Sequence, residues 1–416
     1  MNPLWGAYRV VAPVVGALAP AAGVFTSPAE RVLWLERLGH VARTGGCDAW
    51  VHAASLGEVV AAQPLVRELE RLYPGARLQL TTTTRSGRER LRAAGRDAVL
   101  APLDTPQAVR RFHHDVRPAR LFLIETELWP HWLLEARRAK LPVAVVSARL
   151  SERSVHRYQR LGGELRALIA GLAAVLCQGD DDLQRWLALG AVAERTCVVG
   201  NLKSDGLPQA VPDRAEARRA LGVEPRRPLL VLGNVRPGEP RLLARAWRSL
   251  RPGLRSGWRV VAVPRHPRAL AQLQSEAIAA GLTSPRDATP SDTWRWDERL
   301  GVLTQWYQAA DVAFVGGSLA PYGGHNPMEA AACGAAVVMG MHDFAQRGSV
   351  RALERGGALW RVGDSIALAR ALESLLGDAG VRDERSRAGI RVAAAERGSA
   401  VRAVAELVGR GLWPPS

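Results

Sequence analysis

The chain contains few cysteines and almost no lysine. Only two of its 56 basic residues are lysines, Lys140 and Lys203, so the rest are arginines. The four cysteines lie far apart and show no CxxC or Cys/His ligand spacing; they are Cys47, Cys177, Cys197 and Cys333. This pattern argues against a zinc site and against a dense disulfide framework, and it suits a reducing compartment. The chain also lacks the GxGxxG fingerprint and the P-loop, which argues against NAD and ATP chemistry.

The composition is that of a globular protein with a strong positive charge. Hydrophobic residues make up 47% and charged residues 23% of the 416 residues, so wholesale disorder is excluded. This length predicts two domains of roughly 150–200 residues. The net charge of +16 favours anionic partners such as nucleic acid, phosphorylated small molecules or an acidic membrane face. No basic run is interleaved with aromatic residues, so nucleic acid is not an expected partner.

Residues 10–29 carry no charge and allow three interpretations. The segment is rich in alanine and is interrupted by two prolines and two glycines, Pro13, Gly16, Pro20 and Gly23. It is therefore weak as a membrane-spanning helix, and we expect it to dock at a membrane interface. The alternatives are an ordinary buried segment, and a signal peptide or true span, since residues 17–19 resemble a cleavage site.

Short apolar runs alternate with longer amphipathic ones from Cys47 onward, which is typical of βαβ units and parallel sheets. Strands are expected at 48–53, 77–82, 120–124, 143–146, 174–176 and 198–199, and then at 228–232, 259–263, 312–315 and 336–338. Helices are expected at 59–72, 183–189, 241–250, 269–280, 327–332, 366–376 and about 385–408. The fold class is therefore α/β with two doubly wound domains that face a ligand-binding cleft.

We divide the chain into four segments. Residues 1–36 form the apolar segment, 37–206 the first domain and 207–390 the second. Residues 391–416 form a C-terminal helix that is able to cross back to the first domain.

Carboxylates follow two strands of the first domain. Glu58 lies where a small-residue turn opens a helix. It is either a general base facing the cleft or a carboxylate that only stabilises the helix N-terminus, and the local sequence does not decide between these roles. Glu125 and Glu127 suggest contact with a polar ligand, unless one of them caps the helix that starts near Pro130.

Two further turns of the first domain are suited to bind an anion. After the strand at 143–146, Ser151 is placed to cap a helix while Arg149 or Arg153 meets an anion. Residues 81–87 offer hydroxyls and backbone amides at the start of a helix, a pattern of low specificity.

The glycine-rich stretch 315–329 is the most informative part of the second domain. Asn326 and Glu329 flank Pro327 at the N-cap and N3 positions, which predicts a capping box. Capping does not explain the two glycine pairs or His325. With Arg265 and His266 at the end of another strand, the stretch indicates binding of a phosphate and a nucleoside.

Seven segments, in this order, resemble a known family: HAASLGEV, TTTTRSG, IETELWP, SARLSERS, VVGNLKSD, VPRHP and FVGGSLAPYGGHNPMEAAACG. The resemblance runs from about Arg37 to about Gly340 and is to the transferases that attach 3-deoxy-D-manno-octulosonic acid (Kdo) to lipid A precursors. It implies an inverting glycosyltransferase of the two-Rossmann-domain B type, with CMP-Kdo and a lipid A precursor (lipid IVA) as substrates. It also implies a place at the cytoplasmic face of the inner membrane, next to anionic lipids.

The resemblance further implies roles for individual residues. Glu58 corresponds to the general base of the family. The donor side corresponds to Arg265, His266, Gly317, Ser318, Gly324, His325, Asn326 and Glu329, and the cleft to Glu125, Arg149 and Ser151. A CMP-activated sugar brings its own leaving group, so neither a metal ion nor a cofactor is expected.

The chain departs from the family pattern in three places, one of which is residues 10–29, where the family tends to carry a more continuous N-terminal anchor. Where the family usually has Ser-Thr-His before Gly-Glu-Glu, this chain has residues 234–240, Asn-Val-Arg-Pro-Gly-Glu-Pro, so one imidazole and one carboxylate of that pattern are missing. His131 replaces the asparagine usually found after Trp-Pro. Two alternatives remain open: another two-domain glycosyltransferase or epimerase that uses a UDP-sugar, and a non-catalytic membrane adaptor on the same fold.

Overall fold

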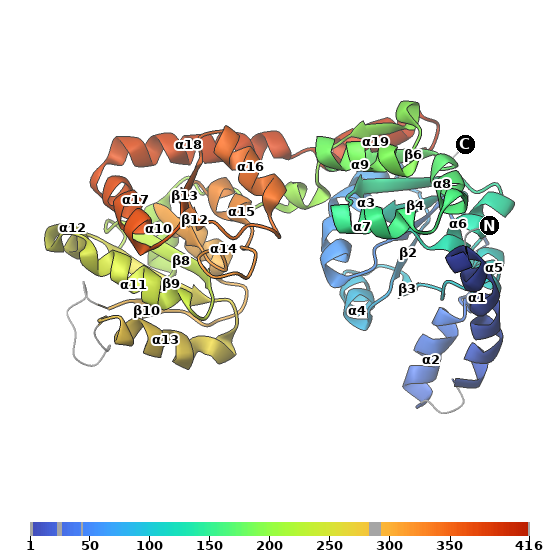
Figure 1. Ribbon diagram of the computed structural model, residues 1–416, viewed down its shortest axis with the longest axis horizontal. Coiled ribbons are helices and arrows are strands. Elements are labelled where there is room, and N and C mark those ends of the chain that lie inside the picture. Colours follow the sequence, from blue (N-terminus) through green and yellow to red (C-terminus); the bar gives the residue numbers. More distant parts are fainter. Residues whose placement is uncertain (1–2, 23–26, 43–44, 283–292, 415–416) are drawn as a thin grey trace. The chain divides into compact units, whose positions relative to one another are not determined.

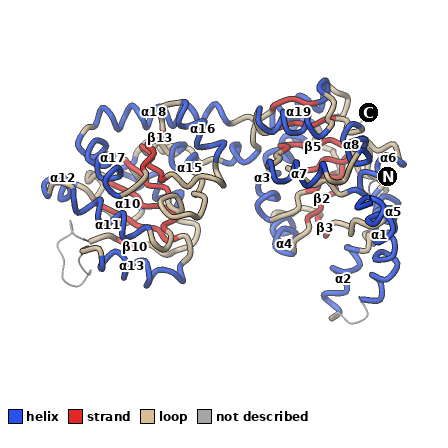
Figure 2. The backbone as a smooth tube through the Cα atoms, viewed as in Figure 1, coloured by secondary structure: helices blue, strands red, loops and turns tan. Residues whose placement is uncertain are grey.

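The computed structural model of the protein describes residues 3–22, 27–42, 45–282 and 293–414. The chain forms two compact units: residues 1–206 with 397–416, and residues 207–396. In each unit, helices surround a central sheet (Figure 1, Figure 2). The chain therefore enters the second unit once and returns to the first through its C-terminal helix.

Unit 1 is built on a seven-stranded parallel sheet with the order β3-β2-β1-β4-β5-β6-β7. Its strands are β1 (Ala49–His52), β2 (Leu78–Thr82), β3 (Ala98–Leu100), β4 (Leu121–Ile124), β5 (Val143–Ala148), β6 (Ala174–Cys177) and β7 (Thr196–Val198). Side chains of the central strands alternate between two apolar clusters: Leu121 and Leu123 pack on one face, and Phe122 and Ile124 on the other. Burial on both faces explains the continuous apolar runs in the sequence.

Helices cover both faces of this sheet, and polar caps start several of them. The helices are α1 (Pro3–Ala22), α2 (Pro28–Arg37), α3 (Leu56–Leu72), α4 (Arg85–Ala93), α5 (Pro106–Val116), α6 (Pro130–Arg138), α7 (Glu152–Gln159), α8 (Gly163–Ala170), α9 (Asp180–Leu189) and α19 (Ser399–Gly409), with 3-10 turns at Ala193–Arg195 and Leu202–Gly206. Ser55, Thr84 and Thr105 each accept a backbone N–H bond at the start of α3, α4 and α5. Such caps begin a helix directly after a strand.

Helix α1 packs on α5 along one face and exposes the other. Trp5 is buried, and the Tyr8 hydroxyl donates a hydrogen bond to the Asp104 carboxylate. The Tyr8 ring also stacks on His131. The opposite face carries five exposed apolar side chains, Val10, Val11, Val14, Val15 and Leu18. Among the residues that the structure describes, no helix is both long enough and apolar enough to cross a membrane.

Unit 2 contains a six-stranded parallel sheet with the order β10-β9-β8-β11-β12-β13. Its strands are β8 (Leu229–Val235), β9 (Arg259–Pro264), β10 (Arg295–Trp296), β11 (Val312–Val315), β12 (Ala336–Gly340) and β13 (Leu359–Val362). Its helices are α10 (Arg214–Ala220), α11 (Glu239–Ser249), α12 (Pro252–Gly257), α13 (Leu270–Ala279), α14 (Leu303–Ala309), α15 (Pro327–Ala332), α16 (Arg347–Arg355), α17 (Ser365–Gly377) and α18 (Ala379–Glu396), with a 3-10 turn at Pro267–Ala269.

Both sheets have the same doubly wound topology. In each, the chain runs outward over three strands and then restarts on the other side of the first, between β1 and β4 in unit 1 and between β8 and β11 in unit 2. Ligands of open α/β sheets bind at this switch point, outside the carboxyl ends of the strands. A ligand-binding site is therefore expected at the turns that follow these four strands.

The structure differs from the sequence prediction in three short strands and in one helix. Strands β3, β10 and β13 were not predicted, because they are short and all three lie at sheet edges. The helix predicted at about 385–408 is two helices, α18 and α19. Gly398 has φ +82° between them, and the Asp205 carboxylate accepts bonds from the backbone N–H groups of Ser399 and Ala400. These bonds start α19 in unit 1.

Candidate active site at two sheet edges

Glu58 is held at the end of β1 by hydrogen bonds from the turn that precedes α3. Its Oε2 accepts from the Ala54 N–H at 2.8 Å, and its Oε1 accepts from the Ser55 hydroxyl at 3.1 Å. The Ser55 hydroxyl in turn accepts from the Glu58 N–H at 3.3 Å. Glu58 therefore occupies the first turn of α3 and also has a fixed carboxylate, so the two roles left open by the sequence are both possible for it.

Burial raises the pKa of the Glu58 carboxyl, and the charge of Glu125 raises it further against the effect of the hydrogen bonds from Ala54 and Ser55. A raised pKa makes a carboxylate a better proton acceptor near neutral pH. The electrostatics of this edge thus suit a general base.

Glu127 is a second perturbed carboxyl at the same edge, where the sequence suggested contact with a polar ligand for Glu125 and Glu127 together. Burial raises its pKa to about 7, and the charges of Glu58 and Glu125 add to the rise. Its Oε2 accepts from the Trp129 indole N–H at 2.7 Å and lies 4.0 Å from His52 Nε2. Burial lowers the pKa of His52 to about 3, so this imidazole is neutral and does not compensate the carboxylate.

Glu125 follows β4 in a left-handed backbone conformation, with φ +63°. Its Oε1 accepts from Lys203 Nζ at 2.6 Å, so the cleft residue predicted from the sequence is paired with one of the two lysines of the chain. The suggestion that Glu125 or Glu127 caps the next helix is wrong. Helix α6 has Trp129 at its N-cap position and no side-chain cap bond.

Arg149 and Ser151 lie after β5, as predicted. Ser151 caps α7 by accepting from the Ser154 N–H at 3.1 Å. The Arg149 side chain is exposed, and its backbone carbonyl accepts a bond from the Thr126 hydroxyl. This bond joins the turn after β5 to the turn after β4.

A buried carboxylate shapes the glycine-rich loop of unit 2. Glu239, at the start of α11, is fully buried and accepts four backbone N–H bonds. Its Oε2 binds the N–H groups of Arg236 (2.9 Å) and Gly317 (2.8 Å). Its Oε1 binds those of Ser318 (2.9 Å) and Leu319 (3.0 Å). Glu239 therefore ties the turn after β8 to the turn after β11.

The predicted residues Gly317, Ser318 and Gly324 are buried inside this loop. Gly317 and Gly324 have φ +72° and +75°, a conformation that favours glycine. The Ser318 hydroxyl donates to the Val315 carbonyl at 2.5 Å and accepts from the Gly340 N–H at 2.8 Å. The Ser318 side chain therefore supports the loop from within.

The helix start predicted at Asn326 is confirmed, but the predicted capping box is not, because Asn326 accepts from the N2 and not the N3 backbone N–H. Asn326 Oδ1 accepts from the Met328 N–H at 3.1 Å, and Pro327 opens α15. Glu329 is largely buried, which raises its pKa, while its hydrogen bond to the Asn326 side chain and the charge of Arg265 oppose the rise. Glu329 thus contacts the cap through its side chain.

Four cationic or titratable side chains gather beside this loop. Burial lowers the pKa of His325 to about 4, and the charges of Arg265, Arg236 and His266 lower it further. The pKa of His266 is lowered by slight desolvation and by the charges of Arg236, Arg265 and Arg268. Both imidazoles are therefore neutral at pH 7, and the arginines carry the positive charge of this edge.

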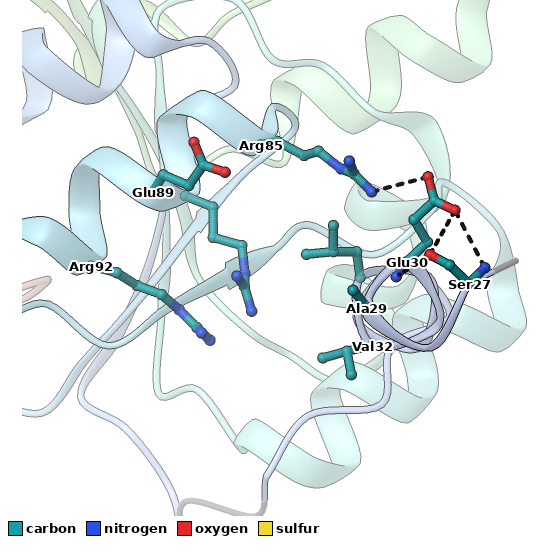
Figure 3. A pocket seen from close by; sticks show the side chains of 9 residues that line it. Ser27, Ala29, Glu30, Val32, Arg85, Glu89 and Arg92 are labelled. Carbon is teal, nitrogen blue, oxygen red and sulfur yellow. Dashed lines mark hydrogen bonds and ion pairs between the residues drawn. The ribbon is translucent and has the colours of Figure 1, made fainter.

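A pocket of unit 1 that Glu58 does not line lies between α2 and α4 and has a volume of about 610 Å³ (Figure 3). Arg85, Arg88 and Arg92 line it, but Arg85 pairs with Glu30, and Arg88 and Arg92 pair with Glu36. Its arginines are thus largely neutralised, and Arg85 is the lining residue that comes from the predicted anion-binding turn at 81–87. Within the described ranges, no group of three or more His, Cys, Asp or Glu side chains could hold a metal ion.

Comparisons with known proteins identify the relatives of the chain. The family model of 3-deoxy-D-manno-octulosonic-acid transferase (kdotransferase) matches residues 33–206. The 3-deoxy-D-manno-octulosonic acid transferase of Haemophilus influenzae is 32% identical, over 84% of this chain and 84% of the relative. That of Bordetella pertussis is 39% identical, over 78% of this chain and 79% of the relative.

Solved structures share the architecture at low sequence identity. The UDP complex of Anabaena Alr3699/HepE superposes with a TM-score of 0.61 at 15% identity, over 87% of this chain and 99% of the other. The UDP-GlcNAc complex of UDP-GlcNAc 2-epimerase from Neisseria meningitidis gives 0.62 at 12% identity, over 87% and 100%. These likenesses confirm the predicted fold of two Rossmann-like domains.

Proposed function

Since the chain belongs to the family of 3-deoxy-D-manno-octulosonic acid (Kdo) transferases, glycosyltransferases of lipopolysaccharide biosynthesis, we propose that it transfers Kdo from CMP-Kdo to a hydroxyl of a lipid A precursor, lipid IVA. Glu58 is the general base, and the basic edge of unit 2 binds the donor. The observation that carries the proposal is the Glu58 carboxylate, which is fixed by Ala54 and Ser55 and has a raised pKa.

The chemistry is a single displacement. Glu58 takes the proton of the acceptor hydroxyl while the oxygen of that hydroxyl forms a bond to the anomeric carbon of Kdo. The bond from that carbon to the phosphate oxygen breaks, and CMP leaves with the electron pair. One displacement inverts the anomeric configuration.

The leaving phosphate gains negative charge in this step, and positive groups that are already in place lower the barrier. Arg265 lies beside His266 and His325, and both imidazoles are neutral at pH 7 and able to donate one hydrogen bond each. Because the arginines supply the positive charge, we propose that transfer needs neither a metal ion nor a cofactor. A chelator such as EDTA is then expected to leave the rate unchanged.

A product assay tests the proposed reaction. The full chain is incubated with a tetra-acylated lipid A precursor and with CMP-Kdo, UDP-glucose or UDP-N-acetylglucosamine, and the lipid products are weighed by mass spectrometry. We expect an added Kdo residue with CMP-Kdo alone. An added hexose from a UDP-sugar, or no product with any donor, would overturn the proposal.

We also propose that the exposed face of α1 docks on anionic lipids at the cytoplasmic face of the inner membrane. Val10 and Leu18 are each 67% exposed, and Val11, Val14 and Val15 lie between them on the same face. Such an apolar stripe inserts at an interface, and the arginines of a chain with a net charge of +16 add attraction to acidic lipids.

Vesicle flotation tests this docking. The double variant Val14→Glu, Leu18→Glu is expected to lose most of its binding to vesicles that contain phosphatidylglycerol, because charge on this face opposes insertion. Ile366→Glu is the matched control, since Ile366 is a comparably exposed apolar residue of unit 2. Equal binding by the double variant and the control would contradict docking through α1.

A further inference from the structure

Arg236 lies in the turn after β8 and has no role in the sequence analysis. Its guanidinium carbon stands 4.1 Å from the centre of the Tyr322 ring, so the ring face supports the cation. Its Nε is buried and has no hydrogen-bond partner in the part of the chain that the structure describes. A buried guanidinium N–H without an acceptor is costly, which points to a partner from outside the chain.

The neighbouring carboxylate of Glu239 does not serve as that partner. The carboxylate tied most closely to this turn is Glu239, and its two oxygens already accept four backbone N–H bonds, one of them from Arg236 itself. The charge of Arg236 instead acts on imidazoles, because it lowers the pKa of both His325 and His266. The guanidinium thus adds positive charge to a place that already contains Arg265.

The glycine-rich loop brings these groups together. A Cβ atom on Gly317 would lie 3.2 Å from the His325 ring and 3.5 Å from the Tyr322 Cβ. The turn after β8 and the loop after β11 therefore hold Arg236, Tyr322 and His325 around one glycine. This is the switch point of the unit 2 sheet, where a ligand of this fold binds.

We propose that Arg236 binds an anionic oxygen of the donor, namely its phosphate, and that Tyr322 holds the guanidinium in place. The inference rests on the proposed function and extends it. A guanidinium stays charged throughout the working range of pH and offers a planar pair of donors to phosphate. Its contact therefore strengthens as the phosphate gains charge on leaving.

Titration calorimetry of the full chain with three probes tests this role. The probes are CMP, cytidine, which lacks the phosphate, and free Kdo, which supplies a carboxylate. Arg236→Ala is expected to weaken CMP binding about 10- to 100-fold, as loss of a charge-assisted hydrogen bond does. Cytidine binding should stay unchanged. Tyr322→Leu should weaken CMP binding less, and Tyr322→Phe should retain it because the ring face remains.

Arg245→Ala is the matched control, because Arg245 is an exposed arginine of α11 and its removal changes the net charge by the same amount. It should leave all three affinities unchanged. Equal CMP affinity for Arg236→Ala and the control would overturn the inference, and so would a loss confined to free Kdo. If the unsubstituted chain fails to bind CMP, the proposed function itself fails, which is a separate outcome. Circular dichroism of each variant shows that the fold is retained.

Discussion

The two sheets share a strand order but differ in charge at their switch points. In unit 1 the turns after β1 and β4 carry Glu58, Glu125 and Glu127, and the pKa values of Glu58 and Glu127 are raised. In unit 2 the turns after β8, β9 and β11 carry Arg236 and Arg265 with two neutral histidines. The same topology thus presents an acidic edge in one unit and a basic edge in the other.

Each edge also contains a carboxylate in the first turn of a helix, and the two are solvated differently. Glu58 accepts one backbone N–H bond and one hydroxyl bond and remains partly exposed. Glu239 is fully buried and accepts four backbone N–H bonds. A carboxylate with unused lone pairs can take a proton from a substrate, whereas a saturated one only holds the backbone in place. Two glutamates in equivalent positions thus differ in role because they accept different numbers of hydrogen bonds: Glu58 is free to take a proton, and Glu239 holds the backbone.

The largest effect is expected for Glu58→Gln. Loss of a general base lowers turnover by about 10²–10⁴-fold, while the amide can still accept a bond from Ala54. Stability should fall by only roughly 0.3–1 kcal/mol, the contribution of a charge near a helix end. Turnover of Kdo transfer and thermal unfolding are measured on the same samples.

Glu68→Gln is the control for this prediction, because Glu68 lies on the same helix and pairs with Arg71 at 2.8 Å. It should leave turnover unchanged. If Glu58→Gln keeps more than about a tenth of the turnover of the unsubstituted chain, Glu58 is not the base.

Glu239→Ala is expected to act on stability, in contrast to Glu58. The change leaves four buried backbone N–H groups without an acceptor, and each such loss costs about 1–3 kcal/mol before water or local rearrangement compensates. We expect unit 2 to lose at least about 3 kcal/mol and the amides of residues 317–319 to exchange hydrogen faster. Denaturant unfolding and hydrogen exchange with mass spectrometry measure both.

The control is Glu276→Gln, whose partly exposed carboxylate accepts only one backbone bond, from the Gly238 N–H at 2.7 Å, and one from the Gln272 side-chain amide at 3.1 Å. Its cost should stay below about 1 kcal/mol. Unchanged exchange of residues 317–319 in Glu239→Ala would show that the loop is held by other contacts, and the contrast between the two carboxylates would fail.

The smallest effect concerns pH and Glu127. Its pKa rises from an ordinary value of 4.5 to about 7 on folding, so the folded chain binds more protons between these values. Stability from this group is therefore full below about pH 4.5 and is lost as pH rises to about 7. The loss is at most about 3 kcal/mol. Glu127→Gln should remove this dependence, so its stability relative to the unsubstituted chain should increase from pH 4.5 to pH 7.

Unfolding free energies of both proteins at several pH values test this prediction. The basic edge provides a comparison of opposite sign, since burial lowers the pKa of His325 from its ordinary value of 6.5 to about 4 on folding. Between about pH 4 and pH 6.5 only the unfolded chain binds this proton, so His325 makes stability rise with pH, and His325→Gln should make the slope between pH 5 and pH 7 more negative. A parallel pH dependence in the unsubstituted chain and in Glu127→Gln would contradict the raised pKa.

Much of the fold follows from local sequence. The run at 121–124 is apolar throughout because both faces of β4 are buried, and β11 occupies the residues predicted for it, Val312–Val315. Asn326 and Pro327 start α15 as predicted, since capping depends on residues within one turn. Strand β3 was not predicted, because its three residues are too few to show a pattern of hydrophobic residues typical of a strand.

The sequence by itself determined that Glu58, Glu125 and Glu127 follow strands and that the glycine-rich loop opens a helix, because these features depend on neighbours along the chain. Only the tertiary structure decided which carboxylate is saturated and which cation lacks a partner. Glu239 binds Gly317, which lies 78 residues further along the chain, and Arg236 meets Tyr322 through the same turn. Contacts at such separations depend on the packing of β8 against β11, and hydrogen-bond saturation and burial are properties of that packing. The chemical role of an acidic or basic side chain in this protein therefore depends on how the strands pack, which the local sequence does not specify.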